Sequence, residues 1–269
     1  MSKLTNQAYL KNEQYNDAAK LNARIQIHKF FSTNTTGWYP WLLEQINLPE
    51  NACILELGCG SGEFWLANHG KIPAEWQVTL SDFSSGMLEQ ARQNLSAGYP
   101  AFTFKVIDAQ SIPYPDASFD AVFANHMLYH VPDRPKALAE IRRVLAPGGQ
   151  LYASTVGEQH MVEEPQLTAR FDPTLAQEVW ARLPGFTLES GQSQLEEFFS
   201  NTRIVRYPDS LHVTKAEPLA DYMLSTTRLG GQHERRPELV AWLERELAER
   251  GGAIDITKDS GVFIARKSA

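Results

Sequence analysis

The sequence of 269 residues has little cysteine, Cys53 and Cys59 being its two. Disulfide bonds therefore do not organise the fold, and a reducing compartment suits the chain. Long hydrophobic runs are missing too, because no stretch approaches the roughly 18 apolar residues of a membrane-spanning helix. Met1–Lys11 is polar and mixed, without the apolar region of a secretory signal peptide. We therefore expect a soluble cytoplasmic protein with no membrane partner.

Positive charge is also scarce. The chain has 25 Lys and Arg against 32 Asp and Glu, a net charge of -7. No overall attraction to a phosphate backbone follows from this balance, so we expect no nucleic-acid partner. With 43% hydrophobic and 21% charged residues, the composition is that of a globular protein of one or two domains. Nothing in the sequence distinguishes a monomer from a homodimer.

Between about residues 51 and 155, short apolar runs alternate with helical stretches. The predicted strands are Cys53–Leu57, Trp76–Leu80, Phe102–Ile107, Ala121–Ala124 and Gln150–Ser154. The predicted helices are Gly62–His69, Ser85–Leu95 and Arg134–Leu145, the last ended by Ala146–Gly149 (APGG). Such alternation indicates parallel pairing with right-handed crossovers, hence a doubly wound, Rossmann-like α/β sheet.

The flanking regions follow a different pattern. Leu4–Ser32 is helical and polar, and the aromatic-rich Gly37–Trp41 follows it. Beyond residue 155 we expect these elements: an amphipathic piece Leu175–Arg182, a strand Asn201–Tyr207, helices Pro218–Leu229 and Arg236–Glu249, and a β-like ending Ala253–Lys267. No Gly/Ser-rich linker separates them from the core. We expect an N-terminal helical lid (1–50), a ligand-binding core (51–155) and a late helical insertion with the final strands of the sheet (156–269).

A glycine-rich turn is the sharpest local signal. Ile54–Gly62 (ILELGCGSG) carries an apolar strand into a G-x-G-x-G turn, where glycines let a ligand touch the main chain. Asp82 ends the next predicted strand, and a carboxylate there accepts hydrogen bonds from the hydroxyls of an adenosine ribose. Nicotinamide dinucleotides and S-adenosylmethionine share that ribose, so the glycine turn and Asp82 together are compatible with either cofactor.

Two carboxylates favour S-adenosylmethionine. Glu63 stands where the dinucleotide fingerprint has its third glycine. Its charge would also oppose a pyrophosphate at the start of the following helix. Glu56 lies at the end of the strand before the turn, and its charge suits a ligand with an ammonium group.

Five segments in register resemble motifs of class I S-adenosylmethionine-dependent methyltransferases, of the methyltransferase type 11 group that acts on small molecules. They are Leu55–Gly62 (LELGCGSG), Leu80–Leu88 (LSDFSSGML), Asp108–Pro115 (DAQSIPYP), Ser118–Val122 (SFDAV) and Arg143–Gly149 (RVLAPGG). The resemblance covers about residues 52–155. It implies a mostly parallel sheet with an antiparallel last strand.

The resemblance also implies S-adenosylmethionine as the cofactor and assigns contacts to it. These are Glu56 and the Gly58–Gly60 backbone for the methionine part, Asp82 for the ribose, Phe83 and Met87 for the adenine face, Asp108 and the Ala109 amide for the adenine edge, and Asn125 near the ammonium group. In related enzymes an N-terminal segment folds over the cofactor and the acceptor. Tyr15 could then face the site, and Arg24 could meet the cofactor carboxylate; docking aromatics would explain the segment equally well.

The candidates for the chemistry follow the fourth predicted strand. Methyl transfer is an in-line displacement at a sulfonium, and a base helps when the nucleophile must lose a proton. His126, Tyr129 and His130 are the candidate catalytic groups, although either histidine could instead hold the loop through backbone hydrogen bonds. His126 and His130 have metal-ligand spacing, but Met127 stands where a zinc-protease motif needs Glu, so we expect no metal.

The expected function is methyl transfer to a small molecule at an oxygen, nitrogen or carbon atom. Asn125–Leu128 (NHML) differs from the Asn-Pro-Pro-Tyr motif of DNA and glutamine amide methyltransferases. This difference argues against a nitrogen of a nucleobase or of an amide as the methyl acceptor. The late insertion is expected to form the other wall of the acceptor pocket, with Phe198, Phe199, Tyr222, Met223 and Trp242 lining it or filling a small core of their own. A non-catalytic cofactor-binding protein and a nicotinamide-dependent oxidoreductase are the alternatives.

Overall fold

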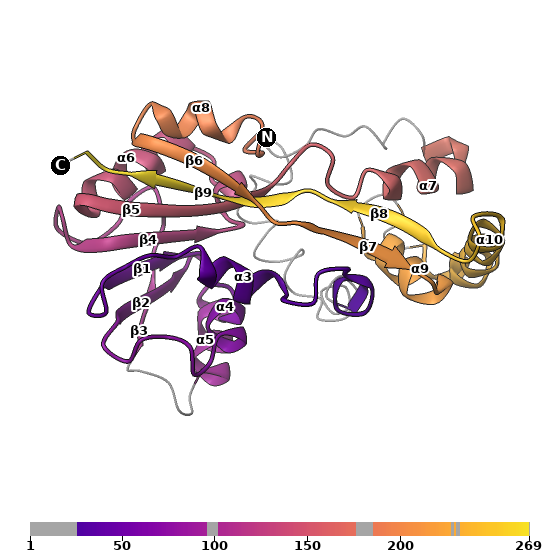
Figure 1. The fold of residues 1–269 in the computed structure, drawn as a ribbon, viewed down its shortest axis with the longest axis horizontal. Coiled ribbons are helices and arrows are strands. Elements are labelled where there is room, and N and C mark those ends of the chain that lie inside the picture. The colour runs from indigo at the N-terminus through magenta and orange to yellow at the C-terminus, as the bar shows by residue number, and fades with distance from the viewer. Residues whose placement is uncertain (1–25, 96–101, 176–184, 227–228, 230–231, 269) are drawn as a thin grey trace.

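The computed structural model describes residues 26–95, 102–175, 185–226, 229 and 232–268. Within these residues a seven-stranded sheet has the order β3-β2-β1-β4-β5-β9-β6 (Figure 1). Its strands are β1 Cys53–Leu57, β2 Gln77–Asp82, β3 Thr103–Val106, β4 Phe119–Asn125, β5 Leu145–Val156, β6 Ser200–Arg206 and β9 Ser260–Arg266. β1 to β5 pair in parallel, and β9 lies antiparallel between β5 and β6. The predicted α/β class, mostly parallel with an antiparallel last strand, is confirmed.

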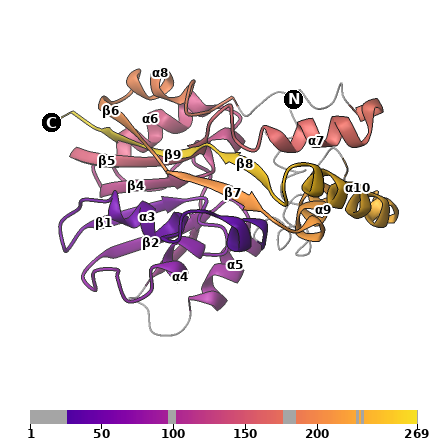
Figure 2. The same cartoon turned by 45° about the vertical axis from the view of Figure 1, so that its right-hand side comes forward.

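Helices cover both faces of the sheet (Figures 1 and 2). On one face lie α3 Trp38–Glu44, α4 Glu63–Ala67 and α5 Ser85–Asn94, and on the other lie α6 Arg134–Val144 and α8 Gly191–Glu196. In β1, Ile54 packs into the core with α3 to α5, while Leu55 and Leu57 pack into the core with α6. A parallel strand buried on both faces reads as a nearly continuous apolar run, which is why β1 is apolar apart from the buried Glu56.

The last strands of the chain run beyond the main sheet as a two-stranded ribbon. β7 Asp209–Val213 follows β6, and β8 Ile254–Lys258 precedes β9; β7 and β8 pair with each other (Figures 1 and 2). The predicted β-like ending is therefore two strands in two sheets. The two strands are separated at Asp259, whose backbone forms hydrogen bonds to the segment after β5 instead of to a neighbouring strand. Its amide donates to His160 Nδ1, and its carbonyl accepts from the Gly157 amide.

A third core lies around this ribbon. It is formed by β7 and β8, by α7 Glu163–Phe171, and by α9 Ala216–Ser225 and α10 Arg236–Glu249. The predicted apolar stripe of α10 is confirmed, because Leu239, Leu243 and Leu247 are buried in this core and Trp242 packs against it. The late segment thus brings its own core and is joined to the sheet through the ribbon.

Several predicted boundaries were wrong. The strand predicted at Gln150–Ser154 is longer, because β5 begins at Leu145 and already contains Ala146–Gly149, and the β4–β5 register shifts across that segment. The predicted helix Pro218–Leu229 lies at Ala216–Ser225. Tyr15, Arg24 and all but the first residue of Leu175–Arg182 lie outside the described residues. Within the described ranges, no helix is long and apolar enough to cross a membrane.

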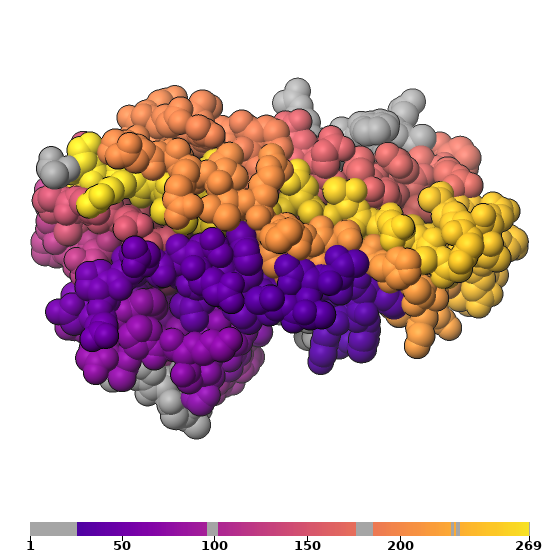
Figure 3. Space-filling model, in the orientation of Figure 1, coloured from indigo at the N-terminus to yellow at the C-terminus, as the bar shows by residue number. Residues whose placement is uncertain are grey.

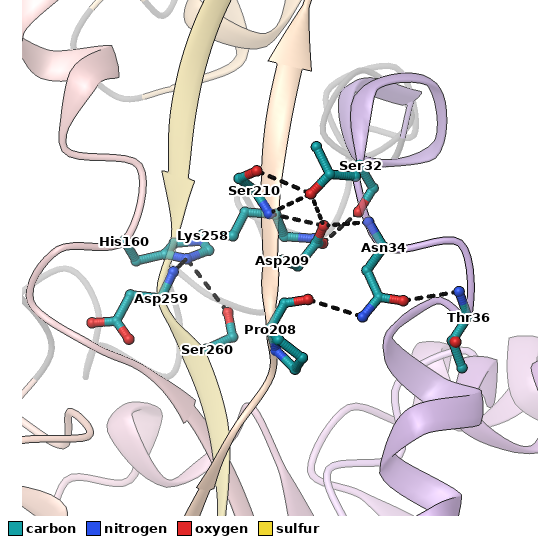
Figure 4. Close-up of polar contacts among 11 residues, drawn as sticks. Ser32, Asn34, Thr36, His160, Pro208, Asp209, Ser210, Lys258, Asp259 and Ser260 are labelled. Atoms are coloured by element: carbon teal, nitrogen blue, oxygen red, sulfur yellow. Dashed lines mark hydrogen bonds and ion pairs between the residues drawn. The ribbon is translucent and has the colours of Figure 1, made fainter.

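The N-terminal segment is tied to the ribbon by one carboxylate. Residues 26–50 form a band between the core and the ribbon (Figure 3). The fully buried side chain of Asp209 pairs with Lys258 Nζ at 2.5 Å, and it accepts hydrogen bonds from Ser32 Oγ and, at 2.9 Å, from the Asn34 amide (Figure 4). Burial alone would raise the pKa of Asp209, but the hydrogen bonds from Lys258 and Ser32 outweigh it and the pKa is lowered. This contact joins three parts of the chain.

Replacing Asp209 by Asn should lower the free energy of unfolding by about 3 kcal/mol, because it leaves Lys258 as an unpaired buried cation. Urea unfolding would measure the change. The control Asp255→Asn removes an exposed partner of His212 and should leave stability nearly unchanged. Because the Asp209 pKa is lower in the folded state, the wild-type advantage is present above pH about 4 and fades as the pH falls through the folded pKa. A difference between wild type and D209N that is independent of pH would contradict this assignment.

Candidate active site

A cavity of about 490 Å³ opens where the strand order reverses between β1 and β4. At this point the connections leave in opposite directions, and loops at the carboxyl ends of the strands leave a crevice for a ligand. All the nominated site residues line it: Glu56, Gly58, Gly60, Asp82, Phe83, Met87, Asp108, Ala109, Asn125, His126, Tyr129 and His130. The described wall residues run from Tyr39 to Val131, so the described part of 156–269 does not line this cavity.

The glycine turn forms the floor of the cavity. Gly58 has φ +69°, in the left-handed region, and a Cβ there would lie 2.8 Å from Met127 Cβ. Gly62 has φ +85°, and a Cβ would lie 2.8 Å from Leu95 Cδ1. Side chains at these positions would thus be strained and would collide with neighbours. The turn therefore keeps bare backbone toward the cavity.

Asp82, the last residue of β2, and Asp108, which follows β3, both line the cavity. The Asp82 carboxylate accepts hydrogen bonds from the Gly60 amide at 3.0 Å and the Ser84 amide at 2.8 Å. Burial raises its pKa, and those hydrogen bonds work in the opposite direction. Asp108 accepts from the backbone and side-chain nitrogens of Gln110 at 2.9 and 3.0 Å. Both carboxylates are held by short local loops and keep oxygen lone pairs for a ligand.

Glu56 is the most deeply buried acid of the site, with 2% of its surface exposed. Burial raises its pKa to about 7, against the effect of two hydrogen bonds. Trp65 Nε1 donates to it at 2.5 Å and Asn125 Nδ2 at 3.0 Å. A carboxyl group in this state is close to half ionised near neutral pH, and a cation beside it would complete its ionisation.

His126 follows β4 in a strained conformation. Its φ of +51° is uncommon for a residue with a side chain, and its amide donates to Ser154 O and Oγ, both at 3.1 Å. The imidazole packs against Trp38, with ring centroids 5.3 Å apart. Burial, together with the nearby His130 and Lys258, lowers its pKa to about 4. His126 is therefore a neutral imidazole at neutral pH.

The loop after His126 is not an α-helix. Leu128–His130 forms a single 3-10 turn, so His126 and His130 do not share one helical face. The rings of Tyr129 and His130 pack edge to face at 4.5 Å. Within the described residues, no three His, Cys, Asp or Glu side chains gather closely enough to hold a metal ion.

The side chains expected to line the acceptor pocket from the late insertion pack into or against cores. Phe199 is buried in the core with α6, Met223 is buried in the core around the ribbon, and Phe198, Tyr222 and Trp242 pack against those cores. Sequence reasoning missed Trp65 as the partner of Glu56, although its place on the helix after the glycine turn was a usable signal. It also missed Tyr207, which meets Trp38 at a ring distance of 5.4 Å.

Comparison with known proteins identifies the domain. Residues 55–153 match the family model described as a methyltransferase domain. The malonyl-[acyl-carrier protein] O-methyltransferase of Erwinia pyrifoliae is 31% identical over 169 residues, 62% of each chain. The demethylmenaquinone methyltransferase of Lactiplantibacillus plantarum is 35% identical over 116 residues, 42% of this chain and 49% of that one. The chain thus spans about half to three-fifths of the length of these relatives.

The fold has solved counterparts. Phosphoethanolamine N-methyltransferase 2 of Haemonchus contortus, in complex with phosphomonomethylethanolamine and S-adenosylhomocysteine, matches with a TM-score of 0.59 and 20% identity. The match covers 100% of this chain and 61% of that one. Residues 55–153 therefore match a methyltransferase domain, and the described sheet around them has the fold of a solved methyltransferase.

Proposed function

We propose that the protein transfers the methyl group of S-adenosylmethionine to a small molecule. The observation that carries this proposal is the convergence of Asp82, Glu56 and Asn125 from three adjacent strand ends on one cavity. Their chemistry fits the cofactor: Asp82 accepts the ribose hydroxyls, Glu56 pairs with the ammonium group, and Asn125 holds Glu56 in place and offers its backbone carbonyl.

The adenine end fits the other nominated residues. Phe83 is 43% exposed, unusual for phenylalanine, and lines the cavity with Met87. Both offer apolar surface to a planar ring. Asp108 accepts from the adenine amino group, and the Ala109 amide donates to the ring. The bare backbone of Gly58–Gly60 lies against the methionine part. A dinucleotide fits less well, since Glu63 lines the cavity at the start of α4.

The bound cofactor supplies a methyl group on a positively charged sulfur. In the transfer, the bond from sulfur to methyl breaks as the bond from the acceptor atom to methyl forms, and the electron pair stays on sulfur. Any proton on the acceptor atom leaves to a base or to water. A pKa of about 4 makes His126 a weak base, so we propose that it orients the acceptor through a hydrogen bond. Tyr129 and His130 complete the wall beside it.

The three regions expected from the sequence fit this division. We propose that residues 51–155 bind the cofactor while 1–50 and 156–269 enclose the acceptor. Trp38 from the first region and Tyr207 from the last contact each other beside His126, which supports it. The free thiols of Cys53 and Cys59 and the net charge of -7 support work in the cytoplasm on a small molecule rather than on nucleic acid.

Asp82→Ala should weaken binding of S-adenosylhomocysteine about 100-fold, because it removes charge-assisted hydrogen bonds to the ribose. Isothermal titration calorimetry measures the affinity. The control Asp116→Ala removes an exposed carboxylate that pairs with Arg143, and it should bind like wild type. Equal affinities of D82A and wild type would refute the ribose assignment, and binding of NADH in place of the sulfur nucleoside would refute the proposed function.

Glu56→Gln should weaken binding of S-adenosylhomocysteine at least about tenfold at pH 8, because the ammonium group of the ligand loses its anionic partner. Wild-type affinity should fall as the pH is lowered from 8 to 6, since Glu56 has a pKa of about 7 and must lose its proton to pair. E56Q should lack this fall. The control Glu63→Gln changes another carboxyl of the cavity and should keep the wild-type pH profile. A pH dependence retained in E56Q would rule out Glu56 as its source.

His126→Asn should bind S-adenosylhomocysteine like wild type but transfer label from methyl-labelled S-adenosylmethionine about tenfold more slowly to any acceptor of a small-molecule panel. Asparagine tolerates the left-handed backbone, so the loop is kept. Equal transfer rates would reduce His126 to a structural role. Cofactor binding by wild type with no transfer to any acceptor would favour the non-catalytic alternative.

A further inference from the structure

Three polar atoms beside the cofactor cavity are buried without a hydrogen-bond partner: His28 Nδ1, Trp38 Nε1 and the Tyr207 hydroxyl. They come from the N-terminal segment, from α3 and from the residue after β6. Among the described residues only two further side-chain atoms share this condition, on Asn68 and Thr202. Three of the five buried polar side-chain atoms that lack a partner in the described residues are therefore on these residues.

The three residues belong to one neighbourhood. The Trp38 ring lies between its neighbours, with centroids 5.3 Å from His126 and 5.4 Å from Tyr207. Lys258 Nζ lies 5.5 Å from the centre of the Tyr207 ring. The charges of Lys258, Asp209 and His126 all act on the pKa of His28, which burial lowers to about 4. The cluster thus adjoins His126 and the Asp209 contact with the ribbon.

Two of these atoms, Trp38 Nε1 and the Tyr207 hydroxyl oxygen, carry a hydrogen that no acceptor in the described residues receives. An indole N–H donates and never accepts. Burial and the charge of Asp209 raise the pKa of Tyr207 to about 12, so its hydroxyl keeps its proton, and the group that faces it, the Gly37 amide, is itself a donor. A buried donor without a partner costs about 1 to 3 kcal/mol. The rings that carry these two donors are in contact, with centroids 5.4 Å apart, and a ligand oxygen would meet their unmet hydrogen bonding.

We propose that Trp38 Nε1–H and the Tyr207 hydroxyl donate hydrogen bonds to a carbonyl or hydroxyl oxygen of the methyl acceptor, and that this acceptor is uncharged. The proposal rests on the proposed methyl-transfer function and places the acceptor next to His126. Since solvent does not reach these atoms, the acceptor must displace the Trp38 ring or α3 as it enters. Gly37, the residue before α3, has φ +80° and gives the helix no side-chain cap.

The charges around the cluster favour an uncharged acceptor. A desolvated carboxylate or phosphate needs a cation beside it. Lys258 is already paired with Asp209 at 2.5 Å, and burial keeps His28 and His126 neutral. The neighbouring cavity wall adds the acids Glu56 and Asp82, which repel an anion. Two neutral donors satisfy a neutral oxygen without any further charge.

The test uses matched variants and two probes of nearly equal shape, acetophenone (neutral) and benzoate (anionic). Calorimetry on the wild-type complex with S-adenosylhomocysteine should show acetophenone binding at least tenfold more tightly than benzoate. Tyr207→Phe and Trp38→Phe should each weaken acetophenone about tenfold, while their affinity for S-adenosylhomocysteine stays within twofold of wild type. The controls are Tyr152→Phe and Trp76→Phe, whose hydroxyl and indole N–H are already bonded to Gln150 and to Pro49 O; both should bind acetophenone like wild type.

Thermal unfolding without ligand gives an independent reading, because Tyr→Phe removes a hydroxyl alone. Tyr207→Phe removes an unpaired donor but also the oxygen that faces the Gly37 amide, so it should lower the melting temperature less than Tyr152→Phe, which should lower it by about 2 to 4 °C. Binding of neither probe, preference for benzoate, wild-type acetophenone affinity in Y207F, or a Y207F melting temperature lowered like that of Y152F each overturns the proposal. A wild-type protein that fails to bind S-adenosylhomocysteine overturns the proposed function instead.

Discussion

The burial of the Glu56 carboxyl is the constraint on which the cavity at the carboxyl ends of β1, β2 and β4 depends. A carboxyl group with 2% exposure inside a parallel sheet needs partners, and each partner fixes another element. Trp65 positions α4, Asn125 positions the end of β4, and the Ser81 hydroxyl donates at 2.7 Å to the Glu56 carbonyl from β2. These contacts satisfy the group without a cation, which leaves its pKa near 7. Under the proposed function the ammonium group of the ligand supplies the missing charge, and the constraint that assembles three strand ends would then also orient the ligand.

A second constraint acts on the acceptor side. The left-handed backbone of His126 is held by two hydrogen bonds to Ser154 on β5, and it directs the ring toward Trp38. Trp38 in turn depends on the segment that Asp209 ties to the ribbon. Strain persists where the surrounding structure over-determines it. Backbone strain at His126 and unmet hydrogen bonding at Trp38 and Tyr207 therefore lie in one region, adjacent to the cavity.

The sequence predicted the core closely where local pattern and burial agree. Cys53–Leu57 and Arg236–Glu249 have the predicted bounds, because an apolar run before glycines and an amphipathic stripe after Pro237 are local signals. The strand predicted at Asn201–Tyr207 corresponds to β6, whereas β7 was missed and β8 and β9 were predicted as one β-like ending. Their break at Asp259 comes from backbone bonds to residues 157–160, a hundred positions earlier in the chain. The Asp209–Lys258 pair and the Trp38–Tyr207 contact are likewise long-range, and they leave no spacing to read.

The core and the flanking segments also differ in how far they resemble other proteins. The family match covers residues 55–153, which contain the glycine turn and every residue proposed to hold the cofactor. Trp38 and Tyr207 lie outside that range, on an N-terminal segment and at the joint of the ribbon. Relatives that match residues 55–153 therefore match the part of this chain that we propose holds the cofactor, whereas the two donors that we propose for the acceptor lie outside that part. The acceptor of this protein is for that reason better approached from the two unpaired donors than from the names of its relatives.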